Sequence, residues 1–179
     1  MKKLLFILLS TVSILSGCST KELKKEEALQ LINKELSYTR VVDYDVFCSD
    51  PKHAKSLLDA GLESNGMVTV QKTQKLKNIG KPLVQFTEKA KPYLLPTPDK
   101  DNALDVQKVK IADEEVIDLS ITQDGENKNT VTVWVEYTSV YKNITPFSVL
   151  MKKNLNDTIR HRVKFSLSAN GWILQKPVL

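Results

Sequence analysis

Residues 130–141 read TVTVWVEYTSVY, a run in which two kinds of side chain alternate. Successive side chains of a β-strand point to opposite faces, so this run predicts a strand with one core-facing side. One face carries Val131, Val133, Val135 and Tyr137, and the other carries Thr130, Thr132, Trp134 and Glu136. Because Trp134 lies opposite the valines, we expect both faces to be covered, one by the core and the other by a helix or a partner.

The sequence around this strand continues the same period-two pattern. Residues 106–111 and 116–121 alternate before it, separated by Asp113-Glu114-Glu115, which we interpret as a solvated bend between two strands. A turn cluster at 124–129 leads into the long strand. After a short helix begun by Thr145-Pro146, residues 159–168 alternate again, and Asn170-Gly171 predicts a tight hairpin into a last strand at 172–174. Residues 105–176 therefore predict an antiparallel sheet of four or five strands.

The N-terminal half mixes helical and extended patterns. We expect a helix over about 20–36, a strand over 38–47, and a short helix over 52–60 that is capped by Asp50-Pro51. Short strands at 67–70 and 83–86 follow, joined by a polar, basic loop at 71–81. A helical turn at 87–95 precedes a boundary rich in proline at 96–102. The fold class is therefore α+β.

Part of this half resembles a known DNA-binding fold. Residues 57–62 (LLDAGL), a strand, a basic loop, a second strand and residues 86–90 (FTEKA) occur in the order of the second half of a winged-helix domain. The resemblance covers residues 53–94, and Ala90 replaces the usual glycine. It implies a similar packing only, because residues 41–47 predict a strand where the family has its preceding helices.

The N-terminus carries a second resemblance. Lys2 and Lys3 precede an apolar run over residues 4–15, and Leu15-Ser16-Gly17-Cys18 follows. This arrangement is similar to the signal peptide and lipobox of bacterial lipoproteins, and an apolar run of this length is too short to span a bilayer. The resemblance implies removal of residues 1–17 and acylation of Cys18, for example with palmitate. It also implies a location at the cell membrane, or at the outer membrane facing the periplasm if the cell is Gram-negative.

The expected mature chain, residues 18–179, is long enough for a single α+β domain with internal parts at 20–95 and 105–176. Loss of Lys2 and Lys3 leaves 24 basic and 21 acidic residues, a formal charge of +3. A nearly balanced charge and export to the envelope both argue against a nucleic-acid partner. With Cys18 lipidated, Cys48 has no partner for an internal disulfide, and we expect it to be a buried thiol.

The candidate contact residues lie in the predicted sheet. Arg160, Arg162 and Lys164 share one strand face, and with Trp134 they are our candidates for contact with a partner protein or a lipid headgroup. The basic loop is a further candidate for such contact. A solvated outer sheet face remains the simpler interpretation of these cations.

No catalytic, metal or cofactor site is predicted. His53 and His161 are the only histidines, and neither has a second His or Cys at ligand spacing. We therefore expect a non-enzymatic binding or accessory protein, attached to its membrane through Cys18 and acting with a protein partner near that membrane. The alternatives are an envelope hydrolase, which requires a pocket holding His161 or Cys48 beside a carboxylate, and a small-ligand carrier, which requires an apolar cavity.

Overall fold

The computed structural model describes residues 22–123 and 131–175. The expected signal peptide, Cys18 and the predicted turn at 124–129 lie outside these residues. Within them, three α-helices and seven strands form an α+β fold whose main sheet has five antiparallel strands, as the alternating patterns predicted. None of the helices in the described ranges combines the length and the apolar character that a membrane crossing needs.

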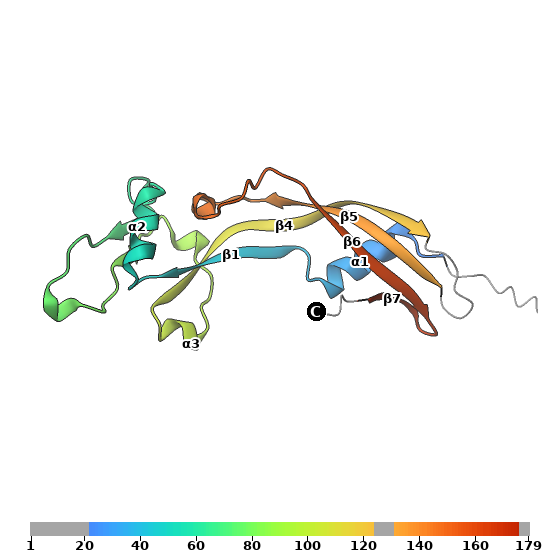
Figure 1. Ribbon diagram of the computed structural model, residues 1–179, viewed down its shortest axis with the longest axis horizontal. Coiled ribbons are helices and arrows are strands. Elements are labelled where there is room, and N and C mark those ends of the chain that lie inside the picture. The colour runs from blue at the N-terminus through green and yellow to red at the C-terminus, as the bar shows by residue number, and fades with distance from the viewer. Residues whose placement is uncertain (1–21, 124–130, 176–179) are drawn as a thin grey trace, which may run out of the picture.

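The main sheet has the strand order β1-β4-β5-β6-β7 (Figure 1). Its strands are β1 (Arg40–Phe47), β4 (Val106–Gln123), β5 (Thr132–Lys142), β6 (Ile159–Ser168) and β7 (Gly171–Gln175). Four of them come from the predicted range 105–176, and the fifth, β1, joins from the N-terminal half by pairing along the first part of β4.

The bend expected at Asp113-Glu114-Glu115 is wrong, because β4 is one continuous strand of 18 residues. It pairs with β1 up to Glu114 and with β5 from Asp113 onward, so Asp113 and Glu114 are held extended from both sides and Glu115 by β5. Irregularities in register at Val42/Asp43 and at Val116/Asp118 let the strand curve without a break.

One core cluster fills the end of the molecule near α2 (Pro51–Asp59). Asp50 caps this helix by accepting a hydrogen bond from the Lys52 amide at 2.7 Å. The chain then forms the two-stranded sheet of β2 (Val68–Val70) and β3 (Val84–Phe86), with the 3-10 helices η1 (Leu76–Asn78) and η2 (Lys91–Tyr93) in the adjoining loops. The helix η3 (Pro146–Leu150) contributes Phe147, which is fully buried among these elements.

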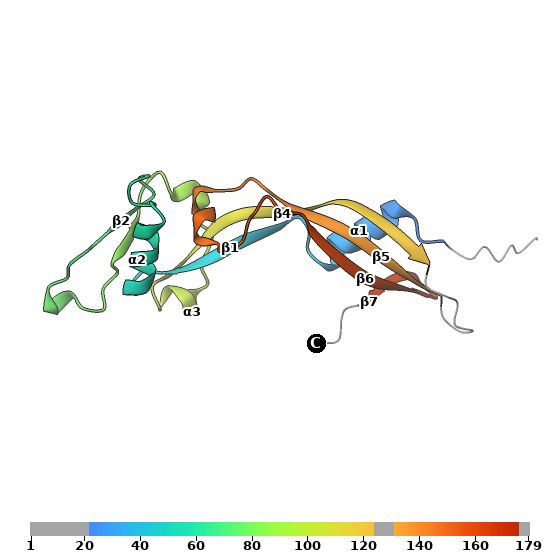
Figure 2. The same cartoon turned by 45° about the horizontal axis from the view of Figure 1, so that its top comes forward.

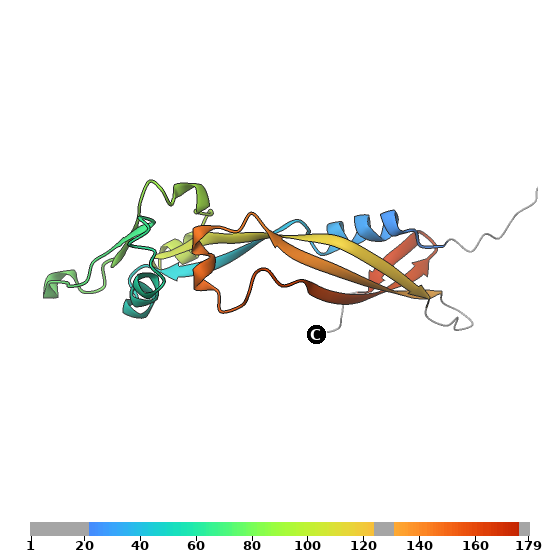
Figure 3. The ribbon, with the colours of Figure 1, turned by 90° about the horizontal axis from the view of Figure 1, so that it is seen from above.

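A second core cluster fills the other end, under α1 (Lys25–Glu35). Ala28 and Ile32 on this helix are fully buried against the sheet face that carries Val133, Val135 and Phe165. Figure 3 shows α1 lying along one side of the curled sheet. The remaining helix, α3 (Asp99–Asn102), precedes β4.

The molecule is elongated (Figures 1 and 2). The strand β4 runs between the two core clusters, and 18 residues of strand span about 60 Å. The helix α1 lies at one end, and the loop between β2 and β3 forms the tip of the opposite end.

Candidate functional site

The four predicted contact residues lie together on the sheet face that α1 leaves uncovered. In the register of β5 and β6, Trp134 is directly opposite Lys164, Glu136 is opposite Arg162, and Thr138 is opposite Arg160. Paired residues of neighbouring strands share a face, and the valines that alternate with Trp134 pack under α1 on the other face. The structure therefore brings all four side chains to one surface, which we call the open face.

Cations, rather than a helix, cover Trp134. The Arg162 guanidinium carbon lies 4.4 Å from the centroid of the Trp134 ring, and Lys164 Nζ lies 5.3 Å from it. Both distances are within the range of cation–π attraction. Arg162 Nε also lies 3.7 Å from Glu136 Oε1. The indole is thus half-buried beneath two charged side chains.

A shallow hollow adjoins this cluster. Its volume is about 350 Å³, and it is lined by Asp118, Leu119, Ser120, Glu136, Tyr137, Thr138, Arg160, His161 and Arg162, so His161 and two carboxylates border the same hollow. Both signs of charge are present, and the lining is more polar than apolar. The hollow therefore suits charged or hydrogen-bonding groups of a ligand better than an apolar small molecule.

A second polar cluster lies on the other face of the sheet, between the two apolar cores. Glu114 has 2% of its surface exposed and Ser139 has none. Glu114 accepts hydrogen bonds from Ser139 Oγ at 2.6 Å and from Arg40 Nε at 2.8 Å. His161 Nε2 lies 2.8 Å from Ser139 Oγ, and its ring stacks on Tyr137 with centroids 4.6 Å apart. We call this set of side chains the Glu114 cluster; it consists of Arg40, Glu114, Ser139 and His161.

The environment of the Glu114 cluster shifts two pKa values downward. Burial acts to raise the pKa of Glu114, but the hydrogen bonds from Ser139 and Arg40 together outweigh it and hold the pKa below its ordinary value. Burial lowers the pKa of His161, and the nearby Glu114 carboxylate offsets this only in part. The cluster at neutral pH therefore consists of a carboxylate, a guanidinium and a neutral imidazole.

The arrangement of the Glu114 cluster differs from that of a hydrolase triad. In such triads a histidine lies between the serine and the carboxylate and takes the serine proton. Here Ser139 lies between His161 and Glu114 and donates its proton to the carboxylate. The hydroxyl is also fully buried, so a substrate carbonyl has no route to it. The geometry is that of a hydrogen-bonded core cluster that joins β4, β5 and β6.

Cys48 and His53, the other candidates in the sequence, make contacts within the fold and do not join either cluster. Cys48 is buried, and burial raises the pKa of its thiol to about 11. His53 Nδ1 accepts a hydrogen bond from the Phe47 amide at 3.4 Å, and its ring contacts those of Tyr44 and Phe47. Across residues 22–123 and 131–175, no three His, Cys, Asp or Glu side chains gather in a way that could hold a metal ion.

Sequence reasoning missed the Glu114 cluster because it interpreted three consecutive acidic residues as solvated. The alternation alone gives no signal for this position. Buried residues of β4 change from Val109 and Ile111 to Ala112 and Glu114, so a strict period of two continued from Ile111 would place Asp113, rather than Glu114, in the core. Arg40, the partner of Glu114, lies 74 residues earlier, where nothing local indicates the pairing.

The chain matches no protein-family model, no curated protein and no solved structure.

Proposed function

We propose that this protein is a lipid-anchored protein of the bacterial cell envelope that binds a partner protein through the open face of its sheet. Leu15-Ser16-Gly17-Cys18, behind the basic and apolar N-terminal residues, supports the anchor. Acyl chains on Cys18 supply membrane attachment, because each buried methylene contributes about 0.8 kcal/mol. Attachment is to the cell membrane, or to the outer membrane facing the periplasm in a Gram-negative cell.

The observation that carries the binding function is the position of Trp134. The strongest contacts of protein interfaces are enriched in tryptophan and arginine, near the centre of a patch from which water is excluded. None of the helices in residues 22–123 and 131–175 covers the sheet face of Trp134, where the Arg162 guanidinium lies over its ring and Lys164 lies beside it. A partner with carboxylates around an apolar contact complements this surface.

The partner proposal favours a binding or accessory role over catalysis. The alternative of a hydrolase would use His161, which lines the hollow with Asp118 and Glu136. The hydroxyl that His161 contacts is that of Ser139, which is buried and donates its proton to Glu114, so the hollow offers no activated nucleophile. The alternative of a small-ligand carrier draws on the hollow beside Arg162, whose lining is more polar than apolar. The winged-helix resemblance of residues 53–94 enters the proposal only as a similarity of packing, without DNA binding.

Two measurements test the two parts of the proposal. Metabolic labelling with a palmitate analogue, followed by fractionation, tests the anchor. We expect label and membrane association in the natural chain, and neither in Cys18→Ser. An unlabelled natural chain in the soluble fraction contradicts the anchor.

Cross-linking in intact cells and affinity purification in detergent test the binding face. We expect one envelope protein to be recovered with the natural chain and to be lost with Trp134→Ala or Arg162→Ala. Val149→Ala is the matched control, because Val149 is 55% exposed and lies away from the open face in η3. Equal recovery with Trp134→Ala and Val149→Ala contradicts the proposed face.

A further inference from the structure

The positive charge of the chain is concentrated in one segment. Residues 51–95 contain eight lysines and only three carboxylates, a formal excess of five positive charges. The rest of residues 18–179 contains sixteen basic and eighteen acidic residues, a formal charge of −2. Charge asymmetry of this kind is typical of proteins that contact a membrane or a nucleic acid.

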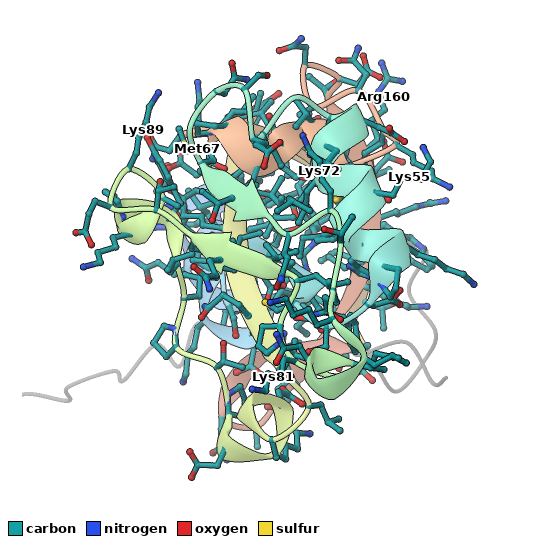
Figure 4. All side chains as sticks on the ribbon, turned by 90° about the vertical axis from the view of Figure 1, so that its left-hand side faces the viewer. Lys55, Met67, Lys72, Lys81, Lys89 and Arg160 are labelled. Carbon is teal, nitrogen blue, oxygen red and sulfur yellow. The ribbon has the colours of Figure 1, made fainter. Side chains whose placement is uncertain are left out.

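This basic segment forms the end of the molecule opposite α1 (Figures 1 and 3). Figure 4 views that end directly and shows Lys55, Lys72, Lys81 and Lys89 spread over it. Lys55 pairs with Asp59, and Lys72 pairs with Glu63 at 3.1 Å. Lys75 and Lys81 are exposed, and no carboxylate of the described residues pairs with either. Their charges are therefore available to an external anion.

Two large aliphatic side chains project at the apex of the same end. Leu76 is 87% exposed and Ile79 is 69% exposed, the highest values among the exposed large hydrophobic residues of the described chain. Leu76 begins η1 and Ile79 directly follows it, and the Ile79 amide closes the turn by donating to the Leu76 carbonyl at 3.2 Å. Leu76 and Ile79 thus form one apolar knob between Lys75 and Lys81.

Hydrogen bonds hold the apex in this shape. The Asn78 amide donates to the Lys75 carbonyl at 2.8 Å, and the Lys81 amide donates to the Asn78 carbonyl at 3.0 Å. Gln74 Nε2 closes the neck of the loop by donating to the Lys81 carbonyl at 3.0 Å. Gly80 turns the chain with a φ of +88°, a value that favours glycine. The knob is therefore a formed element with both aliphatic side chains directed to solvent.

An aliphatic knob beside lysines fits the interface of an anionic bilayer. Lysines near such a surface contribute about 1 kcal/mol each, and binding rises with the apolar area that enters the acyl boundary. Nucleic-acid sites instead use arginine on base edges or aromatic rings on unstacked bases, and the apex has neither. We propose that residues 71–81, the apex loop, insert Leu76 and Ile79 into a membrane surface that carries anionic phospholipid headgroups.

A fluorophore placed at the apex tests this contact locally. Asn78→Cys is labelled with an environment-sensitive NBD probe on protein produced from the complete sequence. Cys48 is buried with a thiol pKa of about 11, which protects it from the reagent, and the parent without Asn78→Cys sets the background. Vesicles contain either phosphatidylcholine alone or phosphatidylcholine mixed equally with phosphatidylglycerol.

We expect a blue shift of the probe, and quenching by lipid-borne quenchers, with the phosphatidylglycerol vesicles only. Leu76→Asp and the double change Lys75→Glu/Lys81→Glu should each weaken this binding roughly tenfold or more, because a buried aliphatic side chain or two interfacial lysines contribute above 1.4 kcal/mol. Ile173→Asp is the matched control, since Ile173 is 49% exposed on β7 near the other end. It should leave the probe response unchanged.

Several results overturn the proposal. A probe that stays in water with both kinds of vesicle excludes insertion of the apex, and an equal shift with neutral vesicles excludes recognition of anionic headgroups. A shift caused by polyglutamate or by duplex DNA, but not by vesicles, assigns the apex to another class of partner. Co-sedimentation with vesicles measures attachment through the lipid on Cys18, whereas the probe measures contact of residues 71–81 with the bilayer. Loss of the anchor and loss of the apex contact are therefore distinguished.

Discussion

Replacing Arg40 by methionine tests the account of the Glu114 cluster. The change keeps the length of the side chain and removes the charge that lies 2.8 Å from Glu114 Oε2. Breaking a buried ion pair lowers the free energy of unfolding by about 3–5 kcal/mol, and breaking an exposed pair lowers it by about 0–1 kcal/mol. The Glu114 side chain is 3% exposed and that of Arg40 is 48% exposed. We therefore expect an intermediate loss of about 2 kcal/mol at pH 7.

The loss in Arg40→Met should depend on pH. Burial acts to raise the pKa of Glu114, and Arg40 opposes it through both a hydrogen bond and its charge, so we expect the pKa of Glu114 to rise when Arg40 is removed. A carboxyl whose pKa is raised in the folded state stabilises the protein when protonated, and this stabilisation disappears as pH rises through the folded pKa. In the natural chain the pKa of Glu114 is lowered, so stability is instead lost below pH 4.5. The difference between the two chains should therefore shrink as pH falls from 7 toward 4.5.

Urea denaturation of the chain without residues 1–17, followed by tryptophan fluorescence at several pH values, measures these differences. The double variant Arg40→Met/Glu114→Gln should recover at least about 1 kcal/mol of the loss, because it leaves no buried charge without a partner. Arg162→Met is the matched control, since Arg162 pairs with Glu136 where both side chains are more than half exposed. Equal losses in Arg40→Met and Arg162→Met, or no recovery in the double variant, contradict the role of Arg40 as the partner of a buried carboxylate.

Three further predictions concern other parts of the structure. Phe147→Ala should lower the free energy of unfolding by about 3–5 kcal/mol, measured by denaturant titration, because its ring is fully buried beside Phe86 and Tyr93. The natural chain should lose stability as pH falls below 6.5, because the pKa of His161 is lowered in the folded state and the unfolded chain binds the proton more readily. His161→Phe should remove this part of the pH dependence of the melting temperature. Iodoacetamide at pH 8 should modify Cys48 at least tenfold more slowly in folded protein than in urea, because burial raises the pKa of the thiol to about 11, and equal rates contradict that burial.

Local patterns predicted much of the fold and of the open face. The alternation at 130–141 predicted β5, Asn170-Gly171 predicted the turn between β6 and β7, and the period of two placed Arg160, Arg162 and Lys164 on one side. Each of these inferences depends on residues close together in the sequence. Strand periodicity also placed Trp134 on the face opposite the valines, although cations rather than a helix cover it.

Long-range pairing limited the remaining predictions. The sequence around Arg40–Phe47 predicts a strand, but its place at the edge of the main sheet depends on pairing with β4, 59 to 74 residues later. The same separation conceals the burial of Glu114, since a carboxylate becomes acceptable in a core only when Arg40 and Ser139 are brought to it. A single sequence contains no record of such partners.

The continuous strand β4 determines how the molecule responds to load. Its pairings with β1 and β5 connect the core under α1 to the core under α2, and all three strands run along the length of the molecule. Tension between the two ends therefore pulls parallel to the strands, and many ladder hydrogen bonds must break together before the ends separate. The fold is built as a stiff strut, able to hold two attached bodies at a fixed spacing.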